Sequence, residues 1–200
     1  MIIRIDTQRL LLRPFTEADL DDLAALHGDS SVMRYIDDGR PVPAEVVAAK
    51  TLPGILRQYT ELPSGLGSRA IIEKATGDFV GWVSLAPASS VGLSVDLSVD
   101  FTVGSAAGLE LGYRLRPTKW GTGYASEAAR AVVDFAFGQL GAERIVATTM
   151  TVNVGSRRVM EKAGLHHVRT FFEEWPTYIP GAEHGDVEYA LTRSDWLGLG

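Results

Sequence analysis

The sequence contains no cysteine, and this absence removes several kinds of chemistry at once. A chain without thiols forms no disulfide framework, offers no thiolate ligand to a metal ion and has no cysteine nucleophile. The absence is also compatible with a reducing compartment. We therefore expect a cytoplasmic protein that binds no metal.

Long apolar runs and an excess of basic residues are also missing. No stretch of about 18 uncharged apolar residues is present, so the sequence predicts no membrane-spanning helix. Residues 1–7 lack the long apolar segment of a secretory leader. The 19 Lys and Arg are outnumbered by 25 Asp and Glu, which gives a net charge of −6. Such a chain lacks the electrostatic footprint of a nucleic-acid binder and leaves room for a cationic partner such as an amine.

What the chain does have is the composition of an ordinary globular domain, with 46% hydrophobic residues in 200. That length is enough for one sizeable core, and no internal repeat or low-complexity tract divides it. We therefore expect residues 1–200 to form a single domain. Within it, residues 87–107 are bounded by turn-forming residues and alternate apolar with polar side chains at 93–101, which predicts an inserted hairpin arm or a surface decoration.

The hydrophobic periodicity predicts strands and helices that alternate along the chain. Strands are predicted at 8–13, 69–74, 79–85, 109–115, 144–150, 166–172 and 186–192. Helices are predicted after a capping box at 16–19, at 43–59 with an interruption at Pro53-Gly54, at 124–137, and from Asn153 to Gly164. This order favours an α/β (α+β) fold, in which helices flank a mixed sheet.

The segment that carries the chemical information joins the strand 109–115 to the helix 124–137. It reads Trp120-Gly-Thr-Gly-Tyr-Ala, and such a glycine turn aims free backbone amides along a helix axis, where a phosphate can bind. A plain helix cap is the alternative. A P-loop is excluded because no Gly-Lys-Ser/Thr follows, and the dinucleotide fingerprint would need glycine at Ser126.

This loop and a second motif, Asn153-Val-Gly-Ser-Arg-Arg-Val-Met-Glu-Lys-Ala-Gly-Leu, together resemble the GNAT acetyltransferase superfamily. The sequence is most similar to the ribosomal-protein N-terminal acetyltransferases (RimJ/RimL type), over nearly the whole chain. The resemblance implies a single GNAT domain with a mixed central sheet of about seven strands, flanked by about four helices. A parallel pair of strands in that sheet would splay apart.

The same resemblance implies acetyl-CoA as the cosubstrate and a primary amine as the acceptor. The acetyl group would pass directly to the amine within a ternary complex. The acceptor would be a protein N-terminus or a small amine such as an aminoglycoside. Transfer of another short acyl group such as succinyl, and a non-catalytic CoA-binding regulatory module, remain as alternatives. A homodimer is compatible with the sequence, and no nucleic acid or membrane is expected as a partner.

Several residues would bind the cosubstrate if the resemblance holds. The backbone of Leu115 would pair with the pantetheine arm, which lies between the splayed strands. Asn153 would hydrogen-bond the same arm, or would act only as a helix cap. Arg158 would meet the 3′-phosphate, or would lie on a solvated helix face. The pyrophosphate would be held by the amides of Trp120, Gly121, Thr122, Gly123, Tyr124 and Ala125.

The expected chemistry also needs an acid and a base. Many members of the superfamily use a tyrosine to protonate the departing thiolate, but Met160 stands at that position here. The branch suggests Ser156 as the replacement, with a capping contact as its alternative role. A carboxylate must take the proton of the amine, and Glu110 is the first candidate, followed by Glu173 and Glu174. Each of these three could also be an ordinary surface carboxylate.

Overall fold

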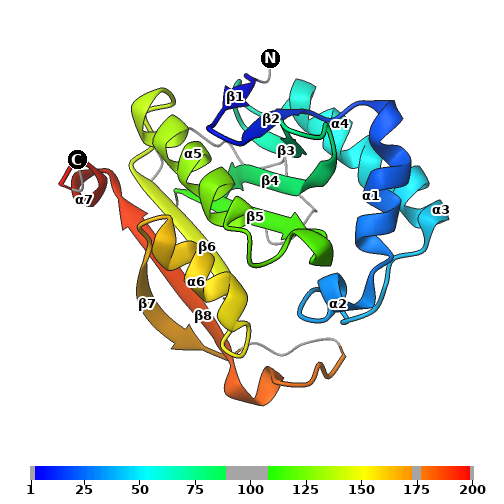
Figure 1. The fold of residues 1–200 in the computed structure, drawn as a ribbon. Helices are drawn as coiled ribbons and strands as arrows, with labels where there is room; N and C mark the ends of the chain where they lie inside the picture. Colours follow the sequence, from blue (N-terminus) through cyan, green and yellow to red (C-terminus); the bar gives the residue numbers. More distant parts are fainter. Residues whose placement is uncertain (1–2, 89–107, 173–176, 199–200) are drawn as a thin grey trace.

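An eight-stranded sheet forms the centre of the molecule in the computed structural model, which describes residues 3–88, 108–172 and 177–198. Its strand order is β1-β2-β3-β4-β5-β6-β8-β7 (Figure 1). All neighbouring strands are antiparallel except β5 and β6, so the sheet is mixed, as expected. The strands are β1 (Ile5–Asp6), β2 (Leu10–Pro14), β3 (Gly67–Glu73), β4 (Phe79–Pro87), β5 (Leu109–Leu115), β6 (Arg144–Met150), β7 (His166–Phe171) and β8 (Asp186–Thr192).

Helices cover both faces of this sheet and build two apolar clusters. The longest helix, α5, packs with α6 on one face, against the leucines of β2 and β5. The N-terminal helices pack on the other face, against the side chain of Trp82 and its neighbours. The helices are α1 (Leu20–His27), α2 (Ser30–Met33), α3 (Ala44–Val46), α4 (Leu52–Glu61), α5 (Tyr124–Gly138), α6 (Val154–Lys162) and α7 (Arg193–Leu197).

The parallel pair β5 and β6 separates after only two residue pairs. Leu109 lies opposite Ile145 and Glu110 opposite Val146, and no further pairing follows although both strands continue. Figure 1 shows the two strands diverging from this point. The splayed parallel pair implied by the family resemblance is therefore present, and Glu110 lies at the closed end of the gap.

Side-chain alternation assigns the residues of β5 to the two faces of the sheet. Leu109, Leu111 and Leu115 are buried against α5, so Glu110 and Arg114 point to the face covered by α1 to α4. Strands β4 and β5 approach each other closely near the end of β5. Gly81 of β4 has a φ of +152°, and a Cβ built there would lie 2.1 Å from the Arg114 carbonyl oxygen. The two strands of the central hairpin thus meet most tightly beside Arg114.

The N-terminal helices confirm two local predictions. Thr16 and Asp19 form the predicted capping box, which opens a 3-10 turn, η1 (Glu17–Asp19), followed by α1. The helix predicted at 43–59 is divided, because Pro53 lacks an amide hydrogen and clashes with a regular helix before it. The chain forms α3, then a π-helical segment η2 (Val47–Thr51), then α4 with Pro53 in its first turn.

Other boundaries differ modestly from the sequence-based expectation. The sheet has eight strands, since the short strand β1 was not anticipated, and β2 begins at Leu10 instead of residue 8. The strand and helix predictions at 109–115, 144–150 and 186–192, and the cap at Asn153, are confirmed. The proposed arm at 87–107 lies almost entirely outside the described residues.

Candidate active site

The loop between β5 and α5 presents a run of free backbone amides. The 3-10 turn η3 (Pro117–Lys119) first uses the amides of Lys119 and Trp120, which donate to the carbonyl oxygens of Arg116 and Pro117 at 2.9 and 3.1 Å. For the amides from Gly121 to Ala125, the described residues supply no acceptor. The free run therefore begins at Gly121, one residue later than the sequence analysis assumed.

Two glycines make this run accessible to a ligand. Gly121 has a φ of +73°, and a Cβ built there would meet no atom within 4 Å. Gly123 precedes the first residue of α5 with a φ of +85°, a conformation that glycine adopts without steric cost. Open space, free donors and the positive end of a 15-residue helix coincide here. The residues present therefore fit a diphosphate.

Residues from distant strands hold the loop in place. Lys119 pairs with Glu73 at 2.5 Å and with Asp78 at 3.2 Å, and the Tyr124 hydroxyl also donates to Glu73. These donors lower the pKa of the Glu73 carboxyl to about 2. Directly before β2, the Arg9 guanidinium donates to the Thr122 carbonyl oxygen at 3.0 Å. Sequence reasoning missed Arg9 and Glu73, because nothing in their local sequence shows that the fold brings them to this loop.

The Trp120 side chain ties the loop back to the end of β5. Its indole nitrogen donates to the Leu115 carbonyl oxygen at 2.7 Å, while half of the side-chain surface stays exposed. One lone pair of the Leu115 carbonyl is therefore occupied. The predicted pairing of the Leu115 backbone with a bound pantetheine arm remains a prediction.

Asn153 caps α6 with both ends of its amide engaged. Its oxygen accepts from the Ser156 amide at 3.2 Å, and its nitrogen donates to the Thr149 hydroxyl at 3.1 Å. The predicted cap is thereby confirmed. Because the cap uses the backbone of Ser156, the Ser156 hydroxyl takes no part in it.

The Ser156 hydroxyl instead faces Tyr113 of β5. The phenol oxygen lies 2.9 Å from both the Ser156 hydroxyl and the Ser156 carbonyl oxygen. Burial raises the pKa of Tyr113, so the phenol keeps its proton and donates it to one of these two oxygens. When the phenol donates to the Ser156 hydroxyl, the hydrogen of Ser156 can point at a third atom; when the phenol donates to the carbonyl oxygen, the serine hydroxyl can donate to the phenol oxygen. A hydroxyl pair thus bridges β5 and α6 on the α5 side of the sheet.

Glu110 lies on the opposite face of the sheet, at the closed end of the gap. Among the described residues, its hydrogen-bond partner is the Thr148 hydroxyl of β6, which donates to the Glu110 carboxylate at 3.4 Å. Burial raises the pKa of Glu110 to about 7, which is suitable for a group that accepts a proton near neutrality. The candidate base and the candidate acid therefore flank the gap from its two sides.

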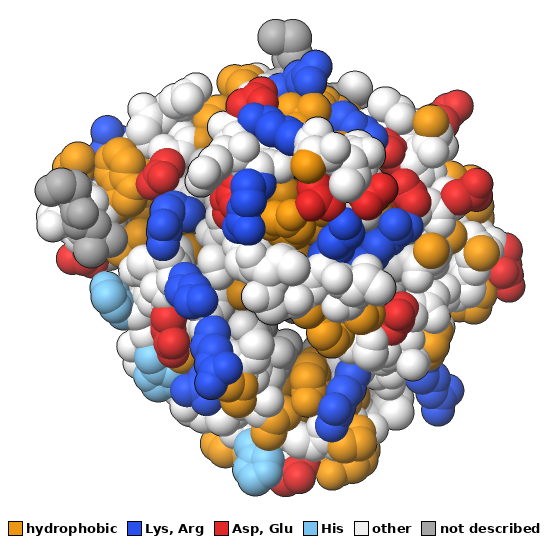
Figure 2. Space-filling model, viewed as in Figure 1, with side chains coloured by type: hydrophobic (Ala, Val, Ile, Leu, Met, Phe, Trp, Pro, Cys, Tyr) orange, Lys and Arg blue, Asp and Glu red, His pale blue; other side chains and the backbone are white. Residues whose placement is uncertain are grey.

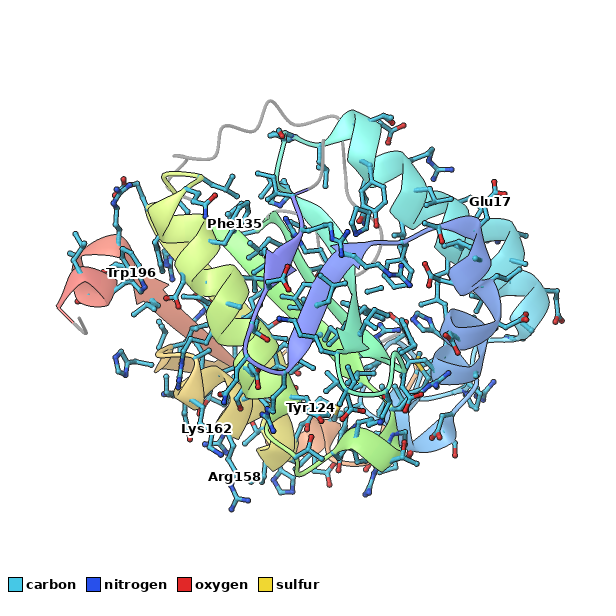
Figure 3. The ribbon with its side chains drawn as sticks, turned by 45° about the horizontal axis from the view of Figure 1, so that its top comes forward. Glu17, Tyr124, Phe135, Arg158, Lys162 and Trp196 are labelled. Atoms are coloured by element: carbon cyan, nitrogen blue, oxygen red, sulfur yellow. The ribbon has the colours of Figure 1, made fainter. Side chains whose placement is uncertain are left out.

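The remaining predicted residues are placed differently. Glu173 and Glu174 lie outside the described residues. Arg158 is exposed on α6 and points away from the protein (Figure 3), whereas Arg157 is held by the Tyr189 hydroxyl and the Thr151 carbonyl oxygen. Lys and Arg side chains gather on this face, over α5 and α6 (Figure 2). Exposed members of the group include Arg130, Arg158 and Lys162.

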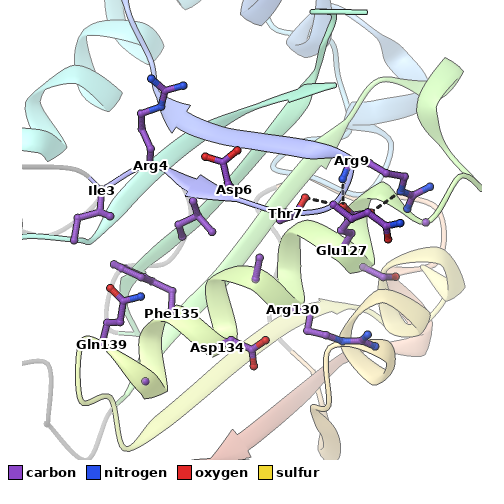
Figure 4. Close-up of a pocket in the computed structure, with 16 residues that line it drawn as sticks. Ile3, Arg4, Asp6, Thr7, Arg9, Glu127, Arg130, Asp134, Phe135 and Gln139 are labelled. Atoms are coloured by element: carbon purple, nitrogen blue, oxygen red, sulfur yellow. Dashed lines mark hydrogen bonds and ion pairs between the residues drawn. The ribbon is translucent and has the colours of Figure 1, made fainter. Parts of the chain in front are cut away.

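Two cavities lie on the surface of the described part. One, of about 820 Å³, lies between residues 3–9 and α5 (Figure 4). Its Glu127 already accepts from the Thr7 hydroxyl, the Arg9 amide and the Arg9 guanidinium, so this carboxylate is engaged within the protein. Neither Glu110 nor Ser156 lines this cavity or the second one. The other, of about 620 Å³, lies between α1, α4 and β5, on the face to which Glu110 points. The second cavity is the candidate acceptor site.

Two features are absent from residues 3–88, 108–172 and 177–198. No helix there is long and apolar enough to cross a membrane. No group of three or more His, Asp or Glu side chains is arranged there to hold a metal ion.

Comparisons with known proteins agree with this arrangement. A family model described as acetyltransferase (GNAT) domain matches residues 9–166. A relative named FsC-acetyl coenzyme A-N(2)-transacetylase, from Aspergillus fumigatus, is 37% identical over 195 residues, covering 98% of this chain and 78% of the relative. The N-acetyltransferase YnaD of Bacillus subtilis, uncharacterized, is 28% identical over 204 residues, covering 97% and 99%.

The solved structures with the same fold include a ribosomal-protein-S5-alanine acetyltransferase from Vibrio fischeri. It matches with a TM-score of 0.72 at 15% identity, covering 97% of this chain and 98% of that one. At this identity the likeness concerns the fold alone.

Proposed function

The chain belongs to the acetyltransferase (GNAT) domain family, and from this membership we propose that it transfers an acetyl group from acetyl-CoA to a primary amine by direct attack in a ternary complex. Acyl transfer from acetyl-CoA to an amine is the reaction that the family supports. The proposed acceptor is a protein N-terminus or a small amine. We further propose that residues 1–200 act as one domain.

One observation carries the proposal: the parallel strands separate at Glu110, beside a loop with free amides. The loop offers donors for a diphosphate at the open end of the gap, from Gly121 to Ala125. The edge of β5 facing the gap is left without a strand partner after Glu110. An extended thioester arm could therefore lie along this edge, between the anion-binding loop and the candidate acid and base.

Glu110 would remove the proton that prevents an ammonium group from attacking. A carboxyl with a pKa of about 7 is half ionised at neutral pH and can accept this proton directly or through one water. Its position at the closed end of the gap, on the α1–α4 face, is the side on which the acceptor cavity lies. A free backbone amide of β5 would stabilise the oxyanion.

Ser156 would donate a hydrogen bond to the departing thiolate from the other face. Tyr113 supports this role, because its phenol oxygen holds the Ser156 hydroxyl in place and can donate to it, and in that arrangement the serine hydrogen points to the thiolate. Asn153 fixes the first turn of α6 and so the position of this hydroxyl. No covalent acyl-enzyme is expected, since the chain has no cysteine.

The acceptor class draws support from the relative with 37% identity. Its name describes transfer from acetyl-CoA to a nitrogen, N(2), of a compound abbreviated FsC. The cavity beside α4, with a volume of about 620 Å³, has the size of a small-molecule site, which supports a small amine as the acceptor.

The test is a thiol-release assay with acetyl-CoA and a panel of amines and N-terminal peptides. The chain itself has no cysteine, so a thiol reagent detects only the released CoA. Direct transfer predicts initial-rate lines that converge when both substrates are varied, and parallel lines would contradict it. Binding of acetyl-CoA with no turnover of any amine would indicate a regulatory CoA-binding module. Faster turnover with succinyl-CoA would redefine the donor.

A further inference from the structure

The acceptor cavity contains an arginine whose charge no carboxylate neutralises at close range. Arg114 projects from β5 toward the α1–α4 face and lines the cavity of about 620 Å³. Its nearest partners are neutral: the His27 ring nitrogen Nδ1 at 3.4 Å, the Met33 sulfur at 3.5 Å, and the Trp82 ring, whose centroid is 5.3 Å away. Among the described residues, no Asp or Glu forms an ion pair with it.

The environment of Arg114 also has more hydrogen-bond donors than acceptors. His27 is buried and uncharged, because burial and the neighbouring Arg114 lower its pKa to about 3. A neutral imidazole has one lone pair, yet two donors approach its ring: the Trp82 indole at 3.3 Å and the Arg114 guanidinium at 3.4 Å. The single lone pair of His27 can serve only one of these two donors, and the other partner of the Arg114 nitrogen is the weakly accepting Met33 sulfur at 3.5 Å.

Two carboxylates, Asp37 and Glu61, and two further cations, Lys50 and Arg57, also line this cavity. None of the four forms an ion pair or a hydrogen bond with Arg114. Asp37 raises the pKa of Arg114 from a distance, but burial has the larger effect and lowers it to about 10. Glu61 lines the rim, where Lys50 and Arg57 also lie. The buried part of the cavity thus combines a guanidinium, a surplus N–H donor and apolar side chains such as Val46 and Ile55.

A carboxylate of the substrate would supply what this pocket lacks. Its two oxygens match the guanidinium fork, and its charge compensates the buried cation. We propose that Arg114 binds a carboxylate of the acceptor, so that this chain acetylates amines that also carry a carboxylate. The proposal rests on the acyl transfer proposed above, and it names the substrate class of that same site.

The spacing along β5 is compatible with a compact acceptor. Arg114 and Glu110 share one face of the strand and lie four residues apart, which corresponds to about 13 Å. Gly112, between them, has no side chain to obstruct this face, and a Cβ there would lie 2.8 Å from the Ser84 hydroxyl. The amine would therefore lie toward Glu110 while the carboxylate reaches Arg114.

The experiment compares acceptors that differ only in a carboxylate. Each pair consists of an amino acid and its amide, or of two tripeptides with Glu or Gln at the second position. Thiol release gives kcat/KM for each member with the wild-type chain and with Arg114→Met. A hydrogen-bonded charge pair predicts that the wild type prefers the carboxylate by about 10- to 200-fold. The variant should lose this preference while it keeps the slower rate with the amides.

Arg144→Met is the matched control, because Arg144 is a strand arginine that already pairs with Glu188 at 2.9 Å. It should leave the carboxylate preference unchanged. Thermal shift of the wild type with CoA plus each member of a pair gives a second measurement that needs no variant. The inference is overturned if the wild type acetylates or binds both members equally, if it neither acetylates nor binds any carboxylate member, or if Arg114→Met keeps the preference. Absence of any shift with CoA alone would instead refute the proposed function.

Discussion

The donor side and the acceptor side of the gap are built in different ways. On the donor side, consecutive backbone amides from Gly121 to Ala125 form the proposed site, and an ion pair of Lys119 with Glu73 and a hydrogen bond from Arg9 to Thr122 hold the loop in place. On the acceptor side, single side chains from α1, α4 and β5 form the cavity, and the charge of Arg114 has no close counter-ion among the residues that the structure describes. A site made of backbone can accept the same cosubstrate in many proteins, whereas a site made of side chains selects one acceptor class.

The largest expected effect is the loss of the proposed base. Glu110→Gln should lower kcat by about 10²- to 10⁴-fold, because the amine proton then has no positioned acceptor. In the wild type, the rate should fall as the pH drops through about 7, and the variant should lack this acidic limb. The pH profile of kcat/KM is the measurement. An unchanged profile in the variant would show that the proton leaves by another route.

The same substitution should stabilise the fold in alkaline solution. The folded chain holds the Glu110 proton up to about pH 7, whereas an unfolded carboxyl releases it near its ordinary pKa of 4.5. Stability is therefore present at low pH and is lost as the pH rises through this window. Glu110→Gln should raise the free energy of unfolding by about 2 kcal/mol at pH 8 relative to wild type, with little effect at pH 4.

A smaller effect is expected on the leaving-group side. Ser156→Ala should reduce kcat by about 10- to 100-fold, since the thiolate loses one hydrogen bond to a charged group. The cap of α6 uses the Ser156 amide, so the melting temperature should hardly change. Tyr113→Phe is the companion variant, and it should cost less because Ser156 keeps its hydroxyl. Full activity of Ser156→Ala would exclude its role as the acid.

On the acceptor side, Asp37→Asn tests whether the negative charge of Asp37 competes with a substrate carboxylate for Arg114. Asp37 has a φ of +53°, which Asn tolerates, and its charge acts on Arg114 from a distance. Removing this competing charge should lower the KM of carboxylate-bearing acceptors by about 3-fold, since long-range charge effects near the surface are modest. The KM of the matched amides should stay constant. An equal change in KM for the carboxylate-bearing acceptor and for its amide would show that the substitution acts through folding or packing instead.

The features that could be predicted from the sequence are mainly those of the donor side. The glycine turn, the strand 109–115 and the cap at Asn153 are local patterns, and the structure confirms the elements that they predict. The ties from Arg9 and Glu73 to the loop could not be predicted, because they join segments that only the folded sheet brings together.

On the acceptor side, even fewer contacts could be predicted from the sequence. His27 of α1 and Arg114 of β5 meet where the helix packs on the sheet, and nothing in the sequence around either residue indicates the contact. The net charge of −6 favours a cationic partner such as an amine, and an amine that also carries a carboxylate agrees with this in part. The charge count gave no indication of the buried cation, because such a count does not locate the charges.

The central claim is that the loop at Gly121 binds acyl-CoA, and thermal shift with matched glycine variants tests it most directly. Gly121 and Gly77 both have positive φ, +73° and +78°, and both have open space around a built Cβ. Alanine should strain each by about 1 kcal/mol, but only Gly121 adjoins the free amides.

The account predicts that acetyl-CoA at 100 times its dissociation constant stabilises the wild type by about 2.7 kcal/mol, and that ATP at the same concentration does not. Gly77→Ala should bind acetyl-CoA as the wild type does, while Gly121→Ala should bind about tenfold more weakly. No stabilisation by acetyl-CoA or CoA, or equal weakening by both alanines, would contradict it. The loop would then be a helix cap, and the fold alone would remain.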